Sequence, residues 1–429
     1  MSREMKNSCI PWIGMIPSTW QKIKVKQSGV KTGSGTTPKS EISRYYGGSI
    51  PWIQSGDLYG TDRITSTSKT VTGDALAEYS ALKTYKKPFI VLAMYGASVG
   101  NIAISDIDAC VNQACCVILP DTSNDISFLK YWLMYCKSDF IKQSVGSGQP
   151  NISQDKILNQ VYVKPSISEQ NAIAYYLDSH CSSIDSAISK HHQIIEKLEE
   201  YRKAVITQAV TKGLNQNVEM KYSCIPWVTS IPEKWSEQPL KLLFSNRKNK
   251  NTDCAETNLL SLSYGRIIRK DINSNEGLLP ENFSGYNIIE PNDIVLRLTD
   301  LQNDHRSLRT GLVTEHGIIT SAYVTLCPKA NINSEYYHYL LHAYDVQKVF
   351  YTLGEGIRQS LKYEDLGKVL VPVPPRVEQD EIVHYLNAMS KMVDDVIDKH
   401  NQLISKLQEY KQSLIYNAVT GKIDCTTEA

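Results

Sequence analysis

The chain has 429 residues, of which 41% are hydrophobic, and its 46 Lys and Arg against 45 Asp and Glu leave a net charge of +1. This length suggests two to four folding units at roughly 100–200 residues each, and the hydrophobic content excludes a wholly disordered chain. The near-zero charge argues against a protein that holds nucleic acid by electrostatics alone, although it permits local basic patches.

In chain order, the first half begins with β-prone runs and ends in a long helix. Runs rich in β-branched and aromatic residues and bounded by Gly, Asp, Asn or Pro predict strands at Ile50–Ile53, Phe89–Tyr95, Asn101–Ile104 and Cys115–Leu119. Phe128–Lys142 has helical periodicity, and Val163–Pro165 marks a stop before the next helix. That helix has apolar or semi-apolar residues in alternating steps of three and four, typical of a coiled-coil seam: His180, Ile184, Ile188, His191, Ile195, Leu198, Arg202, Val205 and Ala209.

The second half follows the same order. It has predicted strands at Ile294–Leu298 and Tyr323–Cys327, a predicted helix over Ser334–Tyr351 and a proline-rich stop at Val371–Pro375. Its seam is Leu386, Met389, Val393, Val396, His400, Ile404, Leu407, Lys411, Leu414 and Ala418. Two such helices of about 45 residues favour pairing with each other over separate packing in a bundle. The sequence predicts an α/β (α+β) fold with two inserts of mixed structure.

An internal duplication covers the two ends of each half. Residues 5–20 and 220–235 are identical at 10 of 16 positions, at an offset of 220 − 5 = 215. The segment from Glu169 to Thr211 is repeated from Glu378 to Thr420, at an offset of 378 − 169 = 209. The middles, roughly 21–164 and 236–373, are not obviously alike. A frame that contacts a fixed partner, with inserts that read a variable target, would give this pattern.

The sequence offers no convincing catalytic, metal or membrane motif. It has no phosphate-binding loop, no Cys-x-x-Cys pair among its 10 cysteines and no apolar run long enough to span a membrane. His338 and His342 lie four residues apart, but residue 339 is Tyr and not the Glu of a zincin, which favours helix packing over a metal site. The first residues contain no signal-peptide core. We expect a non-catalytic protein of the cytoplasm that binds no metal or cofactor itself.

Basic clusters and polar loops are the candidate contacts to nucleic acid. The clusters contain Lys24, Lys31 and Lys39 in the first insert and Arg247, Lys248, Arg266, Arg269 and Lys270 in the second. Each could neutralise phosphates, or could simply be a solvated basic face. Two loops occupy equivalent places upstream of the proline-rich stops and carry groups suited to base edges: Ser147, Gln149 and Asn151, and Arg358, Gln359 and Ser360.

Several motifs together resemble the specificity subunits of type I restriction-modification systems. They are Gly35-Thr-Thr-Pro38, Tyr46–Ile53, Met94–Gly100, Gln149–Ser153, Asp293–Arg297, Gly356–Leu361 and the Pro-x-x-x-Glu-Gln start of each long helix. The resemblance covers essentially the whole chain and adds Thr36, Tyr46, Tyr95, Ser98 and Arg297 as candidate DNA contacts.

The resemblance implies two target-recognition domains, each reading half of a split double-stranded DNA target, with two antiparallel helices between them. On this basis we expect a first domain at 1–164, its spacer helix at 165–213, a linker and second domain at 214–374, and a second spacer helix and tail at 375–429. The helices would dock two methyltransferase subunits, and through them restriction/translocase subunits. The docking candidates are Ile184, Ile188, Ile195, Leu198, Val205, Val393, Ile404, Leu407 and Leu414.

In such a complex the cofactors would belong to the partners: S-adenosylmethionine to the methyltransferases, and ATP and Mg to the restriction subunits. The second insert lacks the Gly-Thr-Pro and Tyr-Gly-Ala-Ser-Val-Gly motifs of the first, so the two half-targets are expected to differ. Two alternatives remain, a coiled-coil adaptor without DNA readout and the recognition part of a fused methyltransferase-nuclease. The adaptor does not explain the divergent inserts, and the fusion needs a cofactor motif.

Overall fold

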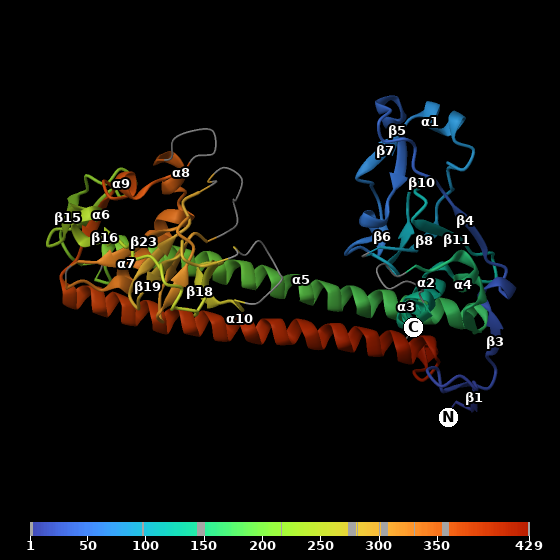
Figure 1. Ribbon diagram of the computed structural model, residues 1–429. Coiled ribbons are helices and arrows are strands. Elements are labelled where there is room, and N and C mark those ends of the chain that lie inside the picture. Colours follow the sequence, from blue (N-terminus) through green and yellow to red (C-terminus); the bar gives the residue numbers. More distant parts are fainter. Residues whose placement is uncertain are drawn as a thin grey trace. The chain divides into compact units, whose positions relative to one another are not determined.

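The computed structural model describes residues 3–96, 98–143, 151–215, 217–272, 280, 282–299, 301, 308–329, 331–353 and 360–427. The chain forms two compact units: unit 1 is Met1–His191 with Gln402–Ala429, and unit 2 is His192–Asn401. The division falls within two long helices, α5 (Ile167–Lys212) and α10 (Arg376–Val419), which are green and red in Figure 1. Each unit therefore contains part of both helices.

The long helices confirm the seam predicted from the sequence. Neither helix contains Gly or Pro over its 46 or 44 residues, so nothing in the backbone interrupts them. Every predicted seam position is buried or half-buried except His180, which is exposed. Gly213 and Gly421 follow the helix ends with φ of 75° and 72°. This left-handed conformation is the usual helix stop and favours glycine.

Unit 1 contains a sheet with strand order β4-β11-β8-β9-β6 and a smaller sheet with order β10-β5-β7. Its other strands form two ribbons, β1-β2 and β12-β3. The strands are β1 (Met5–Asn7), β2 (Met15–Pro17), β3 (Gln21–Lys24), β4 (Lys31–Ser34), β5 (Tyr46–Ile53), β6 (Arg63–Ile64), β7 (Lys69–Val71), β8 (Phe89–Ala93), β9 (Ile102–Ser105), β10 (Cys110–Val111), β11 (Cys115–Leu119) and β12 (Val161–Lys164). The short helices are α1 (Gly73–Glu78), α2 (Ile126–Tyr135), α3 (Lys137–Gln143) and α4 (Gln154–Asn159).

Strand β8 shows why this sheet is buried on both faces. All five of its residues are buried. Ile90 and Leu92 join the core against α2 and the long helices, whereas Phe89 and Val91 join a second core on the opposite face. Alternation along the strand therefore supplies two cores. The predicted helix over 128–142 is two helices, α2 and α3, separated by the buried Cys136.

Unit 2 has a sheet with strand order β16-β23-β20-β21 and the ribbons β13-β14, β15-β24, β17-β18 and β19-β22. The strands are β13 (Met220–Tyr222), β14 (Ser230–Pro232), β15 (Ser236–Pro239), β16 (Phe244–Asn246), β17 (Leu260–Ser263), β18 (Arg266–Arg269), β19 (Asn287–Ile289), β20 (Ile294–Leu296), β21 (Thr310–Leu312), β22 (Gly317–Ile319), β23 (Val324–Pro328) and β24 (Leu370–Val373). The short helices are α6 (Leu240–Leu243), α7 (Ser334–Val346), α8 (Val349–Leu353) and α9 (Tyr363–Leu366).

Two details of unit 2 refine the expectations from the sequence. The predicted helix over 334–351 breaks into α7 and α8 at Lys348, whose φ of 63° no helix can accommodate. Pro372 lies inside β24, opposite Glu237 of β15, and does not simply end the strand before the helix. A proline is tolerated there because, among the described strands, β24 pairs with β15 alone.

The duplicated sequence folds into duplicated structure. The ribbon β1-β2 pairs Met5 with Pro17, and β13-β14 pairs Met220 with Pro232 in the same register. The ribbon β3-β12, which leads into α5, is matched by β15-β24, which leads into α10. Among the described residues, no helix is both long and apolar enough to cross a membrane.

Candidate nucleic-acid interface

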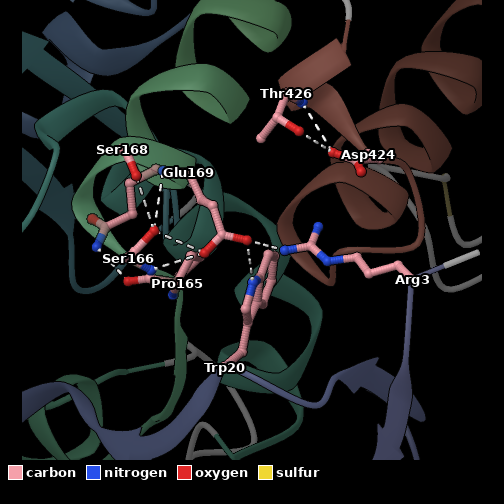
Figure 2. A network of polar contacts seen from close by, with 9 residues as sticks. Arg3, Trp20, Pro165, Ser166, Ser168, Glu169, Asp424 and Thr426 are labelled. Atoms are coloured by element: carbon pink, nitrogen blue, oxygen red, sulfur yellow. Dashed lines mark hydrogen bonds and ion pairs between the residues drawn. The ribbon is translucent and has the colours of Figure 1, made fainter. Parts of the chain in front are cut away.

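A glutamate near the start of each long helix holds a tryptophan of the repeated N-terminal motif. Trp20 Nε1 donates to Glu169 Oε1 at 3.1 Å, and Trp235 Nε1 donates to Glu378 Oε2 at 2.9 Å. In unit 1, Arg3 pairs with the same carboxylate and Ser166 Oγ donates to its other oxygen at 2.8 Å, as Figure 2 shows. Burial alone would raise the pKa of Glu169, but these donors hold it below its usual value.

The next residue, a buried glutamine, fixes a helix of each globular insert. Gln170 Oε1 accepts from the backbone N–H of Asp125, the residue that caps α2, at 2.9 Å. Gln379 Oε1 accepts from the backbone N–H of Asn333, the cap of α7, also at 2.9 Å. The Glu-Gln pair of each repeat therefore connects the long helix both to the N-terminal motif and to the insert.

Two ion pairs between the long helices are related to each other by the same duplication. In unit 2, Arg202 Nη2 of α5 lies 2.6 Å from Asp394 Oδ1 of α10. In unit 1, Lys411 Nζ of α10 lies 2.7 Å from Asp185 Oδ2 of α5. The offset of 209 relates Arg202 to Lys411 and Asp185 to Asp394, so each pair is the image of the other with the helices exchanged. The charged residues that interrupt the apolar seam are thus paired across it.

In unit 1, the structure brings some of the candidate DNA contacts together. Tyr95 and Asn151 form an isolated β-bridge, and the half-buried Ser98 lies in the turn after Tyr95. Burial raises the pKa of the Tyr95 phenol, so it remains a protonated donor at neutral pH. Asn151 is exposed. Tyr95, Ser98 and Asn151 therefore lie just beyond the end of β8, where they are donors suited to a polar ligand.

The other unit 1 candidates are dispersed. Lys24 lies on the ribbon next to the start of α5, 3.5 Å from Asn159 Oδ1, and Lys31 is exposed on β4. Thr36 is half-buried, and Lys39 is exposed near Tyr46, whose hydroxyl donates to Pro38 O at 2.6 Å. Ser147 and Gln149 lie outside the described residues.

In unit 2, Arg247 has a structural role that its sequence context did not indicate. We expected it to contact phosphate, but its Nη2 donates to Asp293 Oδ1 at 3.0 Å, and the Asp293 side chain is fully buried. Burial raises the pKa of Asp293 despite this pairing. The guanidinium therefore compensates the charge of a buried carboxylate through an ion pair within unit 2.

The remaining unit 2 candidates separate into paired and exposed groups. Arg269 is held by Glu315 through Nε at 2.7 Å. Lys248, Arg266, Lys270 and Ser360 are exposed, whereas Arg297 is half-buried. Arg358 and Gln359 lie outside the described residues.

Sequence reasoning did not identify Tyr264, which is 75% exposed between β17 and β18. The Tyr-Gly pair between alternating runs was the available signal.

The side chains proposed to dock partners mostly pack inside the units. Ile184, Val393, Ile404 and Leu414 are at most 7% exposed. Ile188, Ile195, Leu198, Val205 and Leu407 are half-buried. The apolar seam is therefore largely covered by packing within the chain, and the docking role of these side chains stays a prediction. Outward apolar residues at equivalent places in the repeat include Ile194 and Tyr201 on α5 and Leu403 and Tyr410 on α10, which are 41–55% exposed.

The described residues contain no cluster of His, Cys, Asp and Glu able to hold a metal ion.

Residues 17–200 match the type I restriction modification DNA specificity domain. The MjaIX type I restriction enzyme specificity subunit of Methanocaldococcus jannaschii is 24% identical over 96% of this chain and 95% of its own length.

Two solved structures share the fold. The first, described as the structural basis of complex assembly and conformational transition of the type I R-M system, has a TM-score of 0.69 at 14% identity, over 95% of this chain and 99% of its own. The second, the HsdS subunit from Thermoanaerobacter tengcongensis, has a TM-score of 0.50 at 14% identity, over 95% and 98%. The matched domain, this relative and the duplicated frame agree, and the chain is similar to the specificity subunits of type I restriction-modification systems.

Proposed function

We propose that this chain selects the DNA sequence on which a type I restriction-modification complex acts, and that it performs no chemistry itself. The observation that carries the proposal is a duplicated frame around two different globular inserts, in a chain similar to the specificity subunits of such complexes. The frame is repeated, including its Trp-Glu hydrogen bonds, so each of its two copies can bind one copy of the same partner. Because the two inserts contain different sheets, each can bind a different ligand surface.

The target is then bipartite and asymmetric, since each insert reads one half. The strand order of unit 1 is β4-β11-β8-β9-β6 with an additional sheet β10-β5-β7, whereas that of unit 2 is β16-β23-β20-β21. Different scaffolds present different side chains to the groove, and base preference follows from those side chains. We therefore expect two unlike half-targets separated by unspecified base pairs.

The partners are two methyltransferase subunits, and through them restriction/translocase subunits. Ile194 and Tyr201 on α5 and their equivalents Leu403 and Tyr410 on α10 support this assignment, because each pair is seven residues apart and exposed. A spacing of seven places both side chains on one face of a helix. Two equivalent apolar patches are suited to two equivalent partners. S-adenosylmethionine belongs to the methyltransferases, and ATP and Mg to the restriction subunits.

The main experiment maps methylated adenines in DNA from cells that express this chain with its methyltransferase partner. We expect one bipartite motif with unlike halves, absent when either gene is omitted. An adaptor without DNA readout would leave the methylated motif unchanged when this gene is deleted. The purified chain alone, incubated with labelled S-adenosylmethionine and DNA, should transfer no methyl groups, and transfer by a partner-free sample would contradict the non-catalytic role.

The docking patches have their own test. In Tyr201→Ser and Tyr410→Ser an exposed aromatic ring is lost while the buried seam is retained, so each variant should fold normally and bind one methyltransferase copy more weakly. The double variant should lose both copies. Tyr222→Ser, which removes a tyrosine that is 93% exposed outside the helices, is the matched control. Normal two-copy assembly of the double variant, measured by light scattering, would contradict the assignment.

A further inference from the structure

Strands β17 and β18 of unit 2 form an antiparallel hairpin with an exposed tyrosine in its turn. The register pairs Leu262 with Ile267 and Ser263 with Arg266, which leaves Tyr264 and Gly265 as the two turn residues. Both have positive φ, 45° and 79°, the conformation of the tight hairpin turn. The Gly265 N–H donates to Leu308 O at 3.2 Å, so the turn is attached to the body of the unit.

The two faces of the hairpin differ in chemistry. Leu260, Leu262 and Ile267 pack into the core with Ile289 and Val295. Residues directly opposite in an antiparallel pair share a face, so the register assigns the other face to four side chains. They are Ser261, Ser263, Arg266 and Ile268.

Among the residues of this hairpin that the structure describes, Tyr264, Arg266 and Ile268 are exposed, whereas Ser261 and Ser263 are half-buried. Ile268 is 41% exposed and Tyr264 is 75% exposed. Arg266 is exposed, and no described residue accepts a hydrogen bond from its side chain or forms an ion pair with it. Arg269, by contrast, lies opposite Leu260 and is held by Glu315 at 2.7 Å. None of the four outer residues is acidic.

We propose that the outer face of the β17-β18 hairpin reads base edges in the DNA major groove at the second half-target. The inference rests on the proposed function and adds the element and residues that carry it. The major groove admits a two-stranded β-ribbon. Arg266 is suited to the O6 and N7 atoms of guanine, Ile268 to the methyl group of thymine, and Ser261 and Ser263 to any base edge. Tyr264, at the turn, is placed to donate to a phosphate.

The spacing of these residues makes the prediction more specific. Arg266 and Ile268 are two residues apart on one strand, or about 7 Å at roughly 3.4 Å per residue. Consecutive base pairs are about 3.4 Å apart along each strand of DNA. If the strand follows the groove, the second half-target contains a guanine and a thymine about two base pairs apart.

The test uses the full chain in complex with its methyltransferase partner and a plasmid library of randomised inserts, with methylated sites read by sequencing. Arg266→Ala should lose the guanine preference at one position and slow methylation of the original site about 5- to 150-fold. Arg266→Lys retains the charge but not the two-pronged geometry, so it should lose the same preference and retain the salt dependence of binding. Ile268→Ala should relax the thymine position.

Controls separate readout from folding. Arg269→Ala removes a surface ion pair with Glu315 from the same strand and should retain the original motif. All variants should retain the first half-target and the wild-type melting temperature. If Arg266→Lys and Ile268→Ala methylate the original motif at the wild-type rate, or if Arg269→Ala relaxes the same position as Arg266→Ala, the hairpin assignment is overturned while the proposed function stands. If the wild-type complex methylates no bipartite motif, the proposed function itself fails.

Discussion

At the residue scale, a histidine of α7 makes the stability of unit 2 depend on pH. The Nε2 atom of His338 is shielded from solvent and has no hydrogen-bond partner among the described residues. Burial, followed by the nearby His342, lowers the pKa of His338 to about 4. An unfolded histidine has a pKa of about 6.5. Between these two values the unfolded chain binds a proton that the folded chain rejects.

We therefore expect the free energy of unfolding of unit 2 to fall as the pH is lowered from about 6.5 towards 5. For one proton the slope approaches about 1.4 kcal/mol per pH unit. The measurement is urea unfolding of the full chain across this range, for wild type and His338→Gln. Glu290 raises the pKa of His316, which therefore titrates with the opposite sign, so the difference between the two proteins is the informative quantity.

His180→Gln is the control, because His180 is exposed on α5 in unit 1. It should leave the pH dependence of unit 2 as in wild type. A His338→Gln protein with the full wild-type slope would contradict the role given to this histidine.

Residue roles were the least predictable feature of the sequence. Arg247 lies in a run of basic residues, and only the fold places its guanidinium against Asp293, 46 positions further along the chain. The converse holds for Arg266, whose neighbours in sequence resemble those of Arg269 although only the latter has an acidic partner among the described residues. Composition identifies charged residues, but their partners depend on strand register and on long-range packing.

At the element scale, the sequence predicted the long helices and several strands well. Their signal is local periodicity, which survives in any tertiary context. Cys115–Leu119 was predicted with the bounds that the structure has. The breaks within the shorter helices were missed, since Lys348 adopts a positive φ that helical periodicity does not reveal. The pairing of β17 with β18 was missed as well, although Tyr264-Gly265 separates two alternating runs.

The helix pair also contains a charge arrangement that a swap experiment can test. Lys411 Nζ lies 2.7 Å from Asp185 and 3.9 Å from a second carboxylate, Asp62, on the loop before β6. Lys411→Asp places three carboxylates together and should destabilise unit 1 by about 1–3 kcal/mol, and Asp185→Lys should also destabilise it. The double variant should recover part of the loss, with a coupling energy of about 0.5–3 kcal/mol.

Calorimetric melting of the single and double variants measures this coupling. Arg202→Asp with Asp394→Arg is the matched swap in unit 2, where Glu199 lies 3.6 Å from Arg202 as a second carboxylate, and it should recover to a similar extent. Additive losses in both units would show that neither ion pair contributes to helix pairing.

At the scale of the whole molecule, the duplication gives the chain two copies of one structural frame. It extends from sequence offsets of 215 and 209 to matching ribbons, matching Trp-Glu hydrogen bonds and exchanged ion pairs. The sequence predicted the repeat because both copies can be compared directly. It did not predict how the two compact units divide the helices between them.

The division of the helices between the units has a consequence for the molecularity of folding. The core of unit 1 includes Leu414 and Val419 from the end of α10, and the core of unit 2 includes Ile206 and Val210 from the end of α5. A cut between Gly213 and Met220 would therefore leave two fragments, each lacking part of its own core. The peptide link at this point only raises the effective concentration of each fragment near the other.

Residues 1–213 and 220–429, expressed together with a tag on one fragment, should co-purify in equal amounts, and their melting temperature should rise with protein concentration, as for an obligate dimer. Each fragment alone should aggregate or self-associate through its uncovered helix. If either fragment melted cooperatively as a monomer at the temperature of the intact chain, its unit would not need the other fragment's helix. Otherwise folding of the cut protein is second order, and the peptide link between the halves acts as a tether that makes it first order.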